Sequence, residues 1–71
     1  MVKDIFIRIA DWHCAGLPPS GLSAGERDEV ITSAQGSYLA EHVARTDEEL
    51  QAMDDQSLVA THYSAMVDAA R

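Results

Sequence analysis

Six apolar or amphipathic residues near the N-terminus recur at a spacing that fits a helix. They are separated by three or four positions, which places them on one helical face: Val2, Ile5, Phe6, Ile9, Trp12 and His13. The same segment also permits a strand, because the β-branched residues Ile5, Ile7 and Ile9 alternate with other residues. The hydrophobic pattern alone leaves both interpretations open for residues 3–15.

The C-terminal end of this segment favours the helix. Gly16 stands where a left-handed residue ends a helix, Leu17 follows as its hydrophobic partner, and Pro18 prevents continuation. We therefore predict a helix over residues 3–15 with an unusually wide apolar face. A face this wide predicts burial between neighbours, including a second subunit. The residues predicted to form that oligomer interface are Ile5, Phe6, Ile9 and Trp12.

A capping box opens the second predicted helix. Ser23 and Glu26 have the S/T-x-x-E spacing, in which a hydroxyl and a carboxylate each satisfy a free backbone N–H group. Residues 17–22 before them contain a stiff Pro-Pro pair, and hydrophobic positions continue afterwards to about Arg45. Gly36 in this long helix costs about 1 kcal/mol relative to Ala. We explain the presence of this glycine by close approach of another helix, with a kink in the helix as the alternative. The apolar stripe of the helix comprises Val30, Ile31, Ala34, Tyr38, Leu39, His42 and Val43.

A second capping box, formed by Thr46 and Glu49, predicts a short helix over about residues 47–53. Asp54 or Asp55 then caps a further helix. Carboxylates gather at both helix N-termini, where the helix dipole favours negative charge.

With a last helix over about residues 55–69, the chain is predicted to be all-α, a small bundle of three to four helices in one domain spanning residues 1–71. A chain this short buries only about 60% of its unfolded surface, so its core is marginal. A single cysteine excludes an internal disulfide and indicates a reducing cytoplasm. We therefore expect stabilisation by a homodimer or a tight complex. Neither a signal peptide nor a membrane span is predicted, because Arg8 interrupts the first apolar run.

Residues 26–55 carry the whole net charge of the chain. The formal net charge is −7, and this segment holds nine acidic residues against Arg27 and Arg45. Nucleic acids and anionic lipids repel such a domain, so we expect a partner protein with a basic surface. Capping explains part of this charge but not the lack of interspersed lysine. The residues predicted to bind the partner are Glu26, Asp28, Glu29, Asp47, Glu48, Glu49, Asp54 and Asp55.

A metal site is an alternative, built from His13, Cys14, His42 and His62. A zinc site needs about four ligands that converge tetrahedrally, and the chain has no C-x2-C or H-x3-H pair. We expect His42 and His62 instead to be partly buried, neutral imidazoles with a hydrogen-bond partner. Cys14 lies at the electronegative end of its helix, where a thiol is not activated, and a half-buried thiol is expected. No catalytic residue and no cofactor are predicted.

Residues 46–63 resemble short helical segments of small accessory proteins of bacterial temperate phages and other mobile elements. Those proteins include anti-CRISPR proteins and a phage anti-quorum-sensing protein. The resemblance covers about the last third of the chain and lies in its style, which is short, acidic, Ala-rich and helical. It implies a stoichiometric inhibitor that binds a host protein.

These observations favour a non-enzymatic protein-binding module, a small acidic inhibitor or regulator that docks on a basic surface. One alternative is a structural or assembly subunit that uses its apolar first helix. The other is the metal-binding protein described above.

Overall fold

The N-terminal segment is a helix, and the strand alternative is wrong. In the computed structural model, which describes residues 4–36 and 39–71, helix α1 covers Asp4–Ala15. Ile5 and Ile9 enter the core, whereas Ile7 between them is 58% exposed, so the alternation of isoleucines is not used. The helix ends as predicted, because Gly16 has a φ of +96° and its N–H donates to the carbonyl of Trp12 at 3.0 Å.

Helix α2 begins at the predicted capping box and ends ten residues early. It covers Ala24–Gln35, and Glu26 N–H donates to Ser23 Oγ at 3.1 Å while Glu26 Oε1 accepts from Ser23 N–H at 2.8 Å. The helix was predicted to continue to about residue 45. Instead Gly36 caps it, and the N–H of Gly36 donates to the carbonyl of Thr32 at 2.7 Å. A Cβ at this glycine would lie 2.9 Å from the same carbonyl oxygen, so the end of α2, not another helix, explains the glycine.

The hydrophobic pattern beyond Gly36 belongs to a separate helix, α3, which covers Ala40–Val43. Leu39 and Val43 are buried as predicted, but they reach the core from the N-cap and the last residue of this one-turn helix. Ala44 ends it in the left-handed conformation, with a φ of 53°. Tyr38, which was predicted for the same apolar stripe, lies outside the described residues.

Both remaining helices are confirmed. Helix α4 covers Asp47–Ala52, and its capping box is complete, since Glu49 N–H donates to Thr46 Oγ1 at 3.1 Å and Glu49 Oε1 accepts from Thr46 N–H at 3.0 Å. Helix α5 covers Asp55–Ala69. Its N-cap is Asp54, whose carboxylate accepts from the N–H of Ser57 at 2.8 Å.

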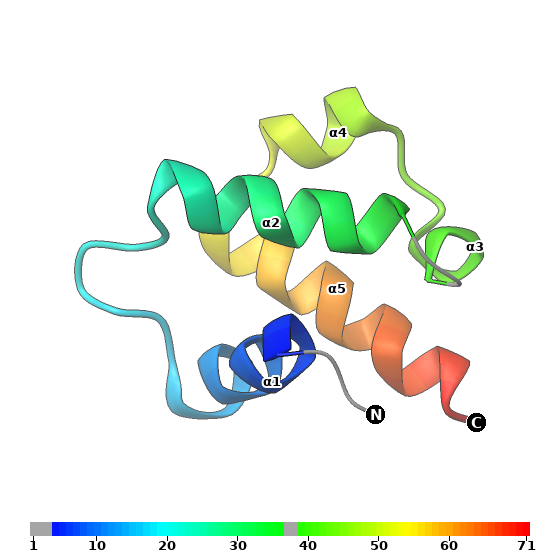
Figure 1. Ribbon diagram of the computed structural model, residues 1–71, viewed down its shortest axis with the longest axis horizontal. Coiled ribbons are helices and arrows are strands. Elements are labelled where there is room, and N and C mark those ends of the chain that lie inside the picture. The colour runs from blue at the N-terminus through cyan, green and yellow to red at the C-terminus, as the bar shows by residue number, and fades with distance from the viewer. Residues whose placement is uncertain (1–3, 37–38) are drawn as a thin grey trace.

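Helix α5 lies at the centre of the fold and packs against α1, α2 and α3. Figure 1 shows α2 crossing α5, with α4 on one side of α2, α1 on the other and α3 near the C-terminal end of α2. The molecule measures 31 × 26 × 17 Å. All regular structure in the described residues is helical, so the predicted all-α class is confirmed, with five helices in place of three to four. The largest fully buried side chains are Ile9, Val30, Leu39, Leu50, Leu58 and His62.

Candidate functional site

The face predicted to form an oligomer interface lies mostly inside the chain's own core. Ile5, Phe6 and Ile9 are buried, because α1 packs against both α5 and α2. They leave almost no surface for a second subunit. Trp12 keeps part of its surface, and the guanidinium of Arg8 lies 5.7 Å from the centre of its ring. Dimerisation itself stays a prediction.

One residue of the predicted partner surface, Asp55, is occupied within the fold. Its Oδ1 accepts from Arg27 Nη1 at 2.7 Å, and its Oδ2 accepts from the N–H of Leu22 at 2.9 Å. Nη2 of Arg27 also donates to the carbonyl oxygens of Gln51 at 3.1 Å and Met53 at 2.8 Å. The N–H of Leu22 first, and then Arg27, hold the pKa of Asp55 below its ordinary value. The corner between α4 and α5 is thus tied to α2 by a single arginine.

Two further acidic residues cap helices and remain exposed. The backbone N–H of Thr46 and then its hydroxyl lower the pKa of Glu49, and the hydroxyl and then the N–H of Ser57 lower that of Asp54. Both side chains therefore stay ionised in mild acid. Capping uses their hydrogen-bonding capacity without neutralising their charge.

The other acidic residues of this segment differ in how far the fold engages them. Glu29 is paired with Arg8 of α1. Asp47 lies 3.0 Å from the side-chain nitrogen of Gln35 in the amide orientation that satisfies both groups. Asp28 and Glu48 are exposed and form no ion pair with any described residue.

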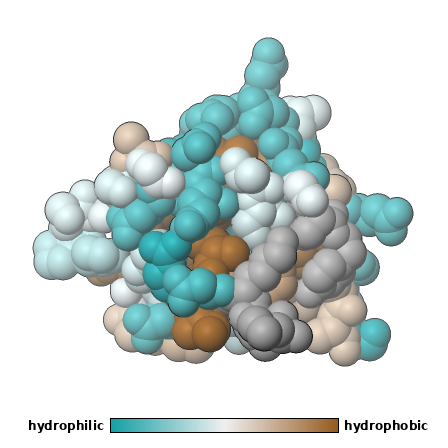
Figure 2. All heavy atoms as spheres, viewed as in Figure 1, coloured by the Kyte–Doolittle hydropathy of each residue, from teal (hydrophilic) through white to brown (hydrophobic). Residues whose placement is uncertain are grey.

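The exposed carboxylates of α2, of α4 and of the α5 N-cap make up what we name the acidic surface. Helices α2 and α4 pack against each other, whereas Asp28 and Glu29 of α2 line a hollow with Ile5 of α1, so the acidic surface covers more than one side of α2. Figure 2 shows the side of the molecule on which α2 lies: hydrophilic side chains cover most of it, and the clearest hydrophobic patches lie low on it, over α1. The acidic surface carries charge with little apolar area.

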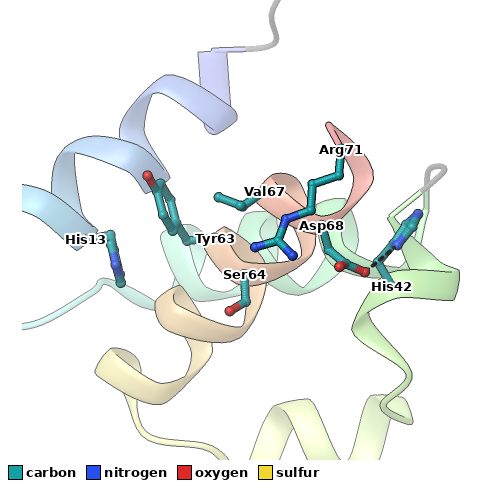
Figure 3. A pocket seen from close by; sticks show the side chains of 7 residues that line it. All are labelled: His13, His42, Tyr63, Ser64, Val67, Asp68 and Arg71. Carbon is teal, nitrogen blue, oxygen red and sulfur yellow. Dashed lines mark hydrogen bonds and ion pairs between the residues drawn. The ribbon is translucent and has the colours of Figure 1, made fainter.

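A second candidate site is a groove of about 420 Å³ between the end of α1, the helix α3 and the C-terminal half of α5, which we name the α5 groove (Figure 3). The ring of His13 stacks on that of Tyr63, with ring centres 4.1 Å apart and planes inclined by 12°. Across the groove, His42 Nδ1 lies 3.0 Å from Asp68 Oδ2. His42 has the hydrogen-bond partner that was predicted, and its side chain is 32% exposed.

Further side chains from the end of α5 complete the α5 groove. Val67 is a large hydrophobic residue that is 39% exposed and lines the groove. The guanidinium of Arg71 points across the groove in Figure 3, over Ser64 and toward Asp68. No carboxylate among the residues described here forms an ion pair with Arg71. None of this could be inferred from the sequence, because the groove joins residues from both ends of the chain.

His62 forms a separate pair inside the core. Its ring is 1% exposed, Nε2 lies 2.9 Å from Ser33 Oγ, and the ring meets Phe6 edge to face at 5.5 Å. Burial lowers the pKa of His62, which favours the neutral imidazole that was predicted, and the ring is fully buried where partial burial was expected. Nδ1 has no hydrogen-bond partner among the described residues. No group therefore orients the ring as a catalytic serine–histidine pair requires, and the contact joins α2 to α5.

The alternative metal site finds no geometric basis in residues 4–36 and 39–71. No group of three or more histidine, cysteine, aspartate or glutamate side chains in those ranges is placed to hold a metal ion. His62 lies in the core, while His13 and His42 face the α5 groove. Cys14, expected to be half-buried, is exposed.

The two candidate sites thus offer recognition by charge and hydrogen bonds. Within the part of the chain that the structure describes, no helix has both the length and the apolar character to cross a membrane. Comparisons with protein-family models, with curated proteins and with solved structures gave no match to this chain.

Proposed function

We propose that the protein is a non-enzymatic binding module whose acidic surface docks on a basic surface of a partner protein. One observation carries this proposal. Of the nine carboxylates in residues 26–55, only Glu29 and Asp55 pair with an arginine, and the other seven form no ion pair with any residue that the structure describes. An acidic residue kept only for the fold would be paired or would cap a helix. Several of these seven residues neither form an ion pair nor cap a helix in the described structure.

The state of the capping residues supports the same proposal. Glu49 and Asp54 accept hydrogen bonds from backbone N–H groups, which keep their carboxylates ionised. They therefore add charge to the acidic surface although they also serve the fold. A surface of one sign increases the rate of encounter with a partner of opposite sign and disfavours acidic competitors.

The resemblance of residues 46–63 to segments of phage accessory proteins extends the proposal to the kind of partner. On this proposal the partner is a host protein, and the module inhibits it stoichiometrically, as an anti-CRISPR protein does. A basic host surface that normally takes nucleic acid is the natural target for a carboxylate-rich competitor. The assembly-subunit alternative gains little from α1, since Ile5, Phe6 and Ile9 are buried within the chain and Ile7 and part of Trp12 are the larger apolar side chains that α1 leaves exposed.

The test uses single charge reversals that leave the fold intact. Glu48→Lys and Asp28→Lys each change an exposed carboxylate without a structural partner, whereas reversals at Glu49, Asp54 or Asp55 would remove a cap or the bond to Arg27. Tagged protein is used to capture partners from host lysate at low and at high salt, and circular dichroism confirms helicity. We expect capture to weaken with each reversal and with added salt.

The matched control is Asp11→Lys. Asp11 is exposed on α1, outside the acidic surface, and its reversal changes the net charge by the same amount. Equal losses from Asp11→Lys and Glu48→Lys would mean that net charge, not this surface, determines capture. Capture that survives high salt undiminished would also contradict the proposal.

A further inference from the structure

We propose that the α5 groove binds a small tetrahedral oxyanion, of the phosphate or phosphomonoester class. The acidic surface has no part in this site, which lies between the end of α1, α3 and α5. The proposal therefore stands or falls independently of the partner protein.

The first reason is the free guanidinium of Arg71. Among the described arginines, Arg8 is paired with Asp4 and Glu29, and Arg27 is paired with Asp55. Arg71 has no such partner in the part of the chain that the structure covers, although the protein as a whole is strongly acidic. A guanidinium presents two parallel N–H groups, which match two oxygens of one oxyanion.

The second reason is the set of hydrogen-bond donors around it. His13 lies on one wall of the groove, stacked on Tyr63, so its ring is held in place while its nitrogens stay free of the stacking contact. His42 lies on the opposite wall, and its Nδ1 is engaged with Asp68. This hydrogen bond holds the ring of His42 at the edge of the groove, beside Asp68.

The third reason is the charge inside the groove. Asp68 is the only carboxylate among the described side chains that line it, and His42 is its partner. The guanidinium of Arg71 lines the same groove and offsets the negative charge that would repel an oxyanion. The net charge of −7 still lowers affinity from a distance, so we expect binding at millimolar rather than micromolar concentration.

The arrangement of the donors selects the class of ligand. In Figure 3 the side chains of His13, His42, Ser64 and Arg71 come from different sides of the hollow. A tetrahedral ion has oxygens directed to all of these sides, whereas a carboxylate offers two oxygens in one plane. The volume of about 420 Å³ admits a phosphomonoester as well as the free ion.

The experiment is a titration of the full chain with inorganic phosphate, followed by nuclear magnetic resonance of backbone and histidine side-chain groups. We expect saturable shifts at His13, His42, Ser64 and Arg71, the same response to sulfate, and a much weaker response to acetate. Arg71→Gln should weaken phosphate binding roughly tenfold or more, because it removes the bidentate contact. Arg71 follows α5 and is exposed, so this variant leaves the packing of the core unchanged.

Arg45→Gln is the matched control. Arg45 is also exposed and without an ion pair to a described residue, but it lines an adjoining hollow rather than the α5 groove. The Arg45→Gln variant should bind phosphate with almost the same affinity as the unmodified protein. Equal weakening by the two variants, equal binding of acetate, or shifts that rise without saturation would each overturn the proposal.

Discussion

Replacement of Arg27 by alanine should test how the acidic corner is held together. The guanidinium links α2 to three acceptors, Asp55 Oδ1, Gln51 O and Met53 O, at distances from 2.7 to 3.1 Å. The replacement leaves Asp55 with the N–H of Leu22 as its remaining donor. Two backbone carbonyl groups at the end of α4 lose a donor at the same time.

The magnitude follows from the number of bonds and their exposure. Hydrogen bonds to charged groups contribute about 1.5–3 kcal/mol each when buried. Here the side chains of Arg27 and Asp55 are 23% and 28% exposed, so water replaces part of what is lost. We therefore expect a loss of about 2–3 kcal/mol for the whole side chain, below the sum of three buried bonds. Small domains have about 0.05–0.15 kcal/mol of stability per residue, so this is a large fraction of the total.

The assay is urea unfolding followed by circular dichroism, as a double-mutant cycle of Arg27→Ala and Asp55→Ala. The two residues are in contact, so the double variant should lose about 1 kcal/mol less than the sum of the single variants. Arg45→Ala is the control and should change stability by less than about 0.5 kcal/mol, because that arginine is exposed and unpaired in the described structure. Strict additivity, or an Arg27→Ala variant as stable as Arg45→Ala, would refute the assignment.

Two further predictions concern the core. Burial places the pKa of His62 below its ordinary value of 6.5, so the unfolded chain binds the proton more readily, and stability should fall as pH drops below about 6.5. In the His62→Gln variant, the free energy of unfolding measured with urea should depend less on pH in that window. The remaining loss of stability should occur only at the lower pH values where carboxylates become protonated. An unchanged slope would contradict the burial argument. Ile9→Ala should cost about 2–5 kcal/mol at any protein concentration and Ile7→Ala almost nothing, since Ile9 is fully buried and Ile7 is 58% exposed. A cost for Ile9→Ala that depends on protein concentration would instead place this face in a dimer.

Local features of the structure could be predicted from the sequence because their determinants lie within a few residues. Both capping boxes, at Ser23 and at Thr46, join residues three positions apart and are present as expected. Glycine after a hydrophobic helix likewise predicted the end of α1 at Gly16. Gly36 was misinterpreted because the hydrophobic spacing continues through it, and only the three-dimensional structure shows that Leu39 reaches the core from the N-cap of a separate helix.

The contacts that define the candidate sites lie far apart in the sequence. Arg27 meets Asp55 across 28 positions, and His42 meets Asp68 across 26. No periodicity connects such residues. The number of acidic residues is therefore known from the sequence, but which of them form contacts within the fold is not. The wide apolar face of α1 was recognised, but amphipathicity indicates only that a face is buried, not which part of the molecule covers it.

The division between engaged and free carboxylates has a consequence for how the protein can change over generations. Asp55 can vary only together with Arg27, whereas Asp28, Glu41 and Glu48 are exposed and have no hydrogen bond or ion pair to a described residue. Substitutions at such positions usually alter stability by less than about 0.5 kcal/mol. If the acidic surface docks on a partner protein as proposed, the free positions can follow changes in that partner one residue at a time, while the corner that holds the helices together stays the same.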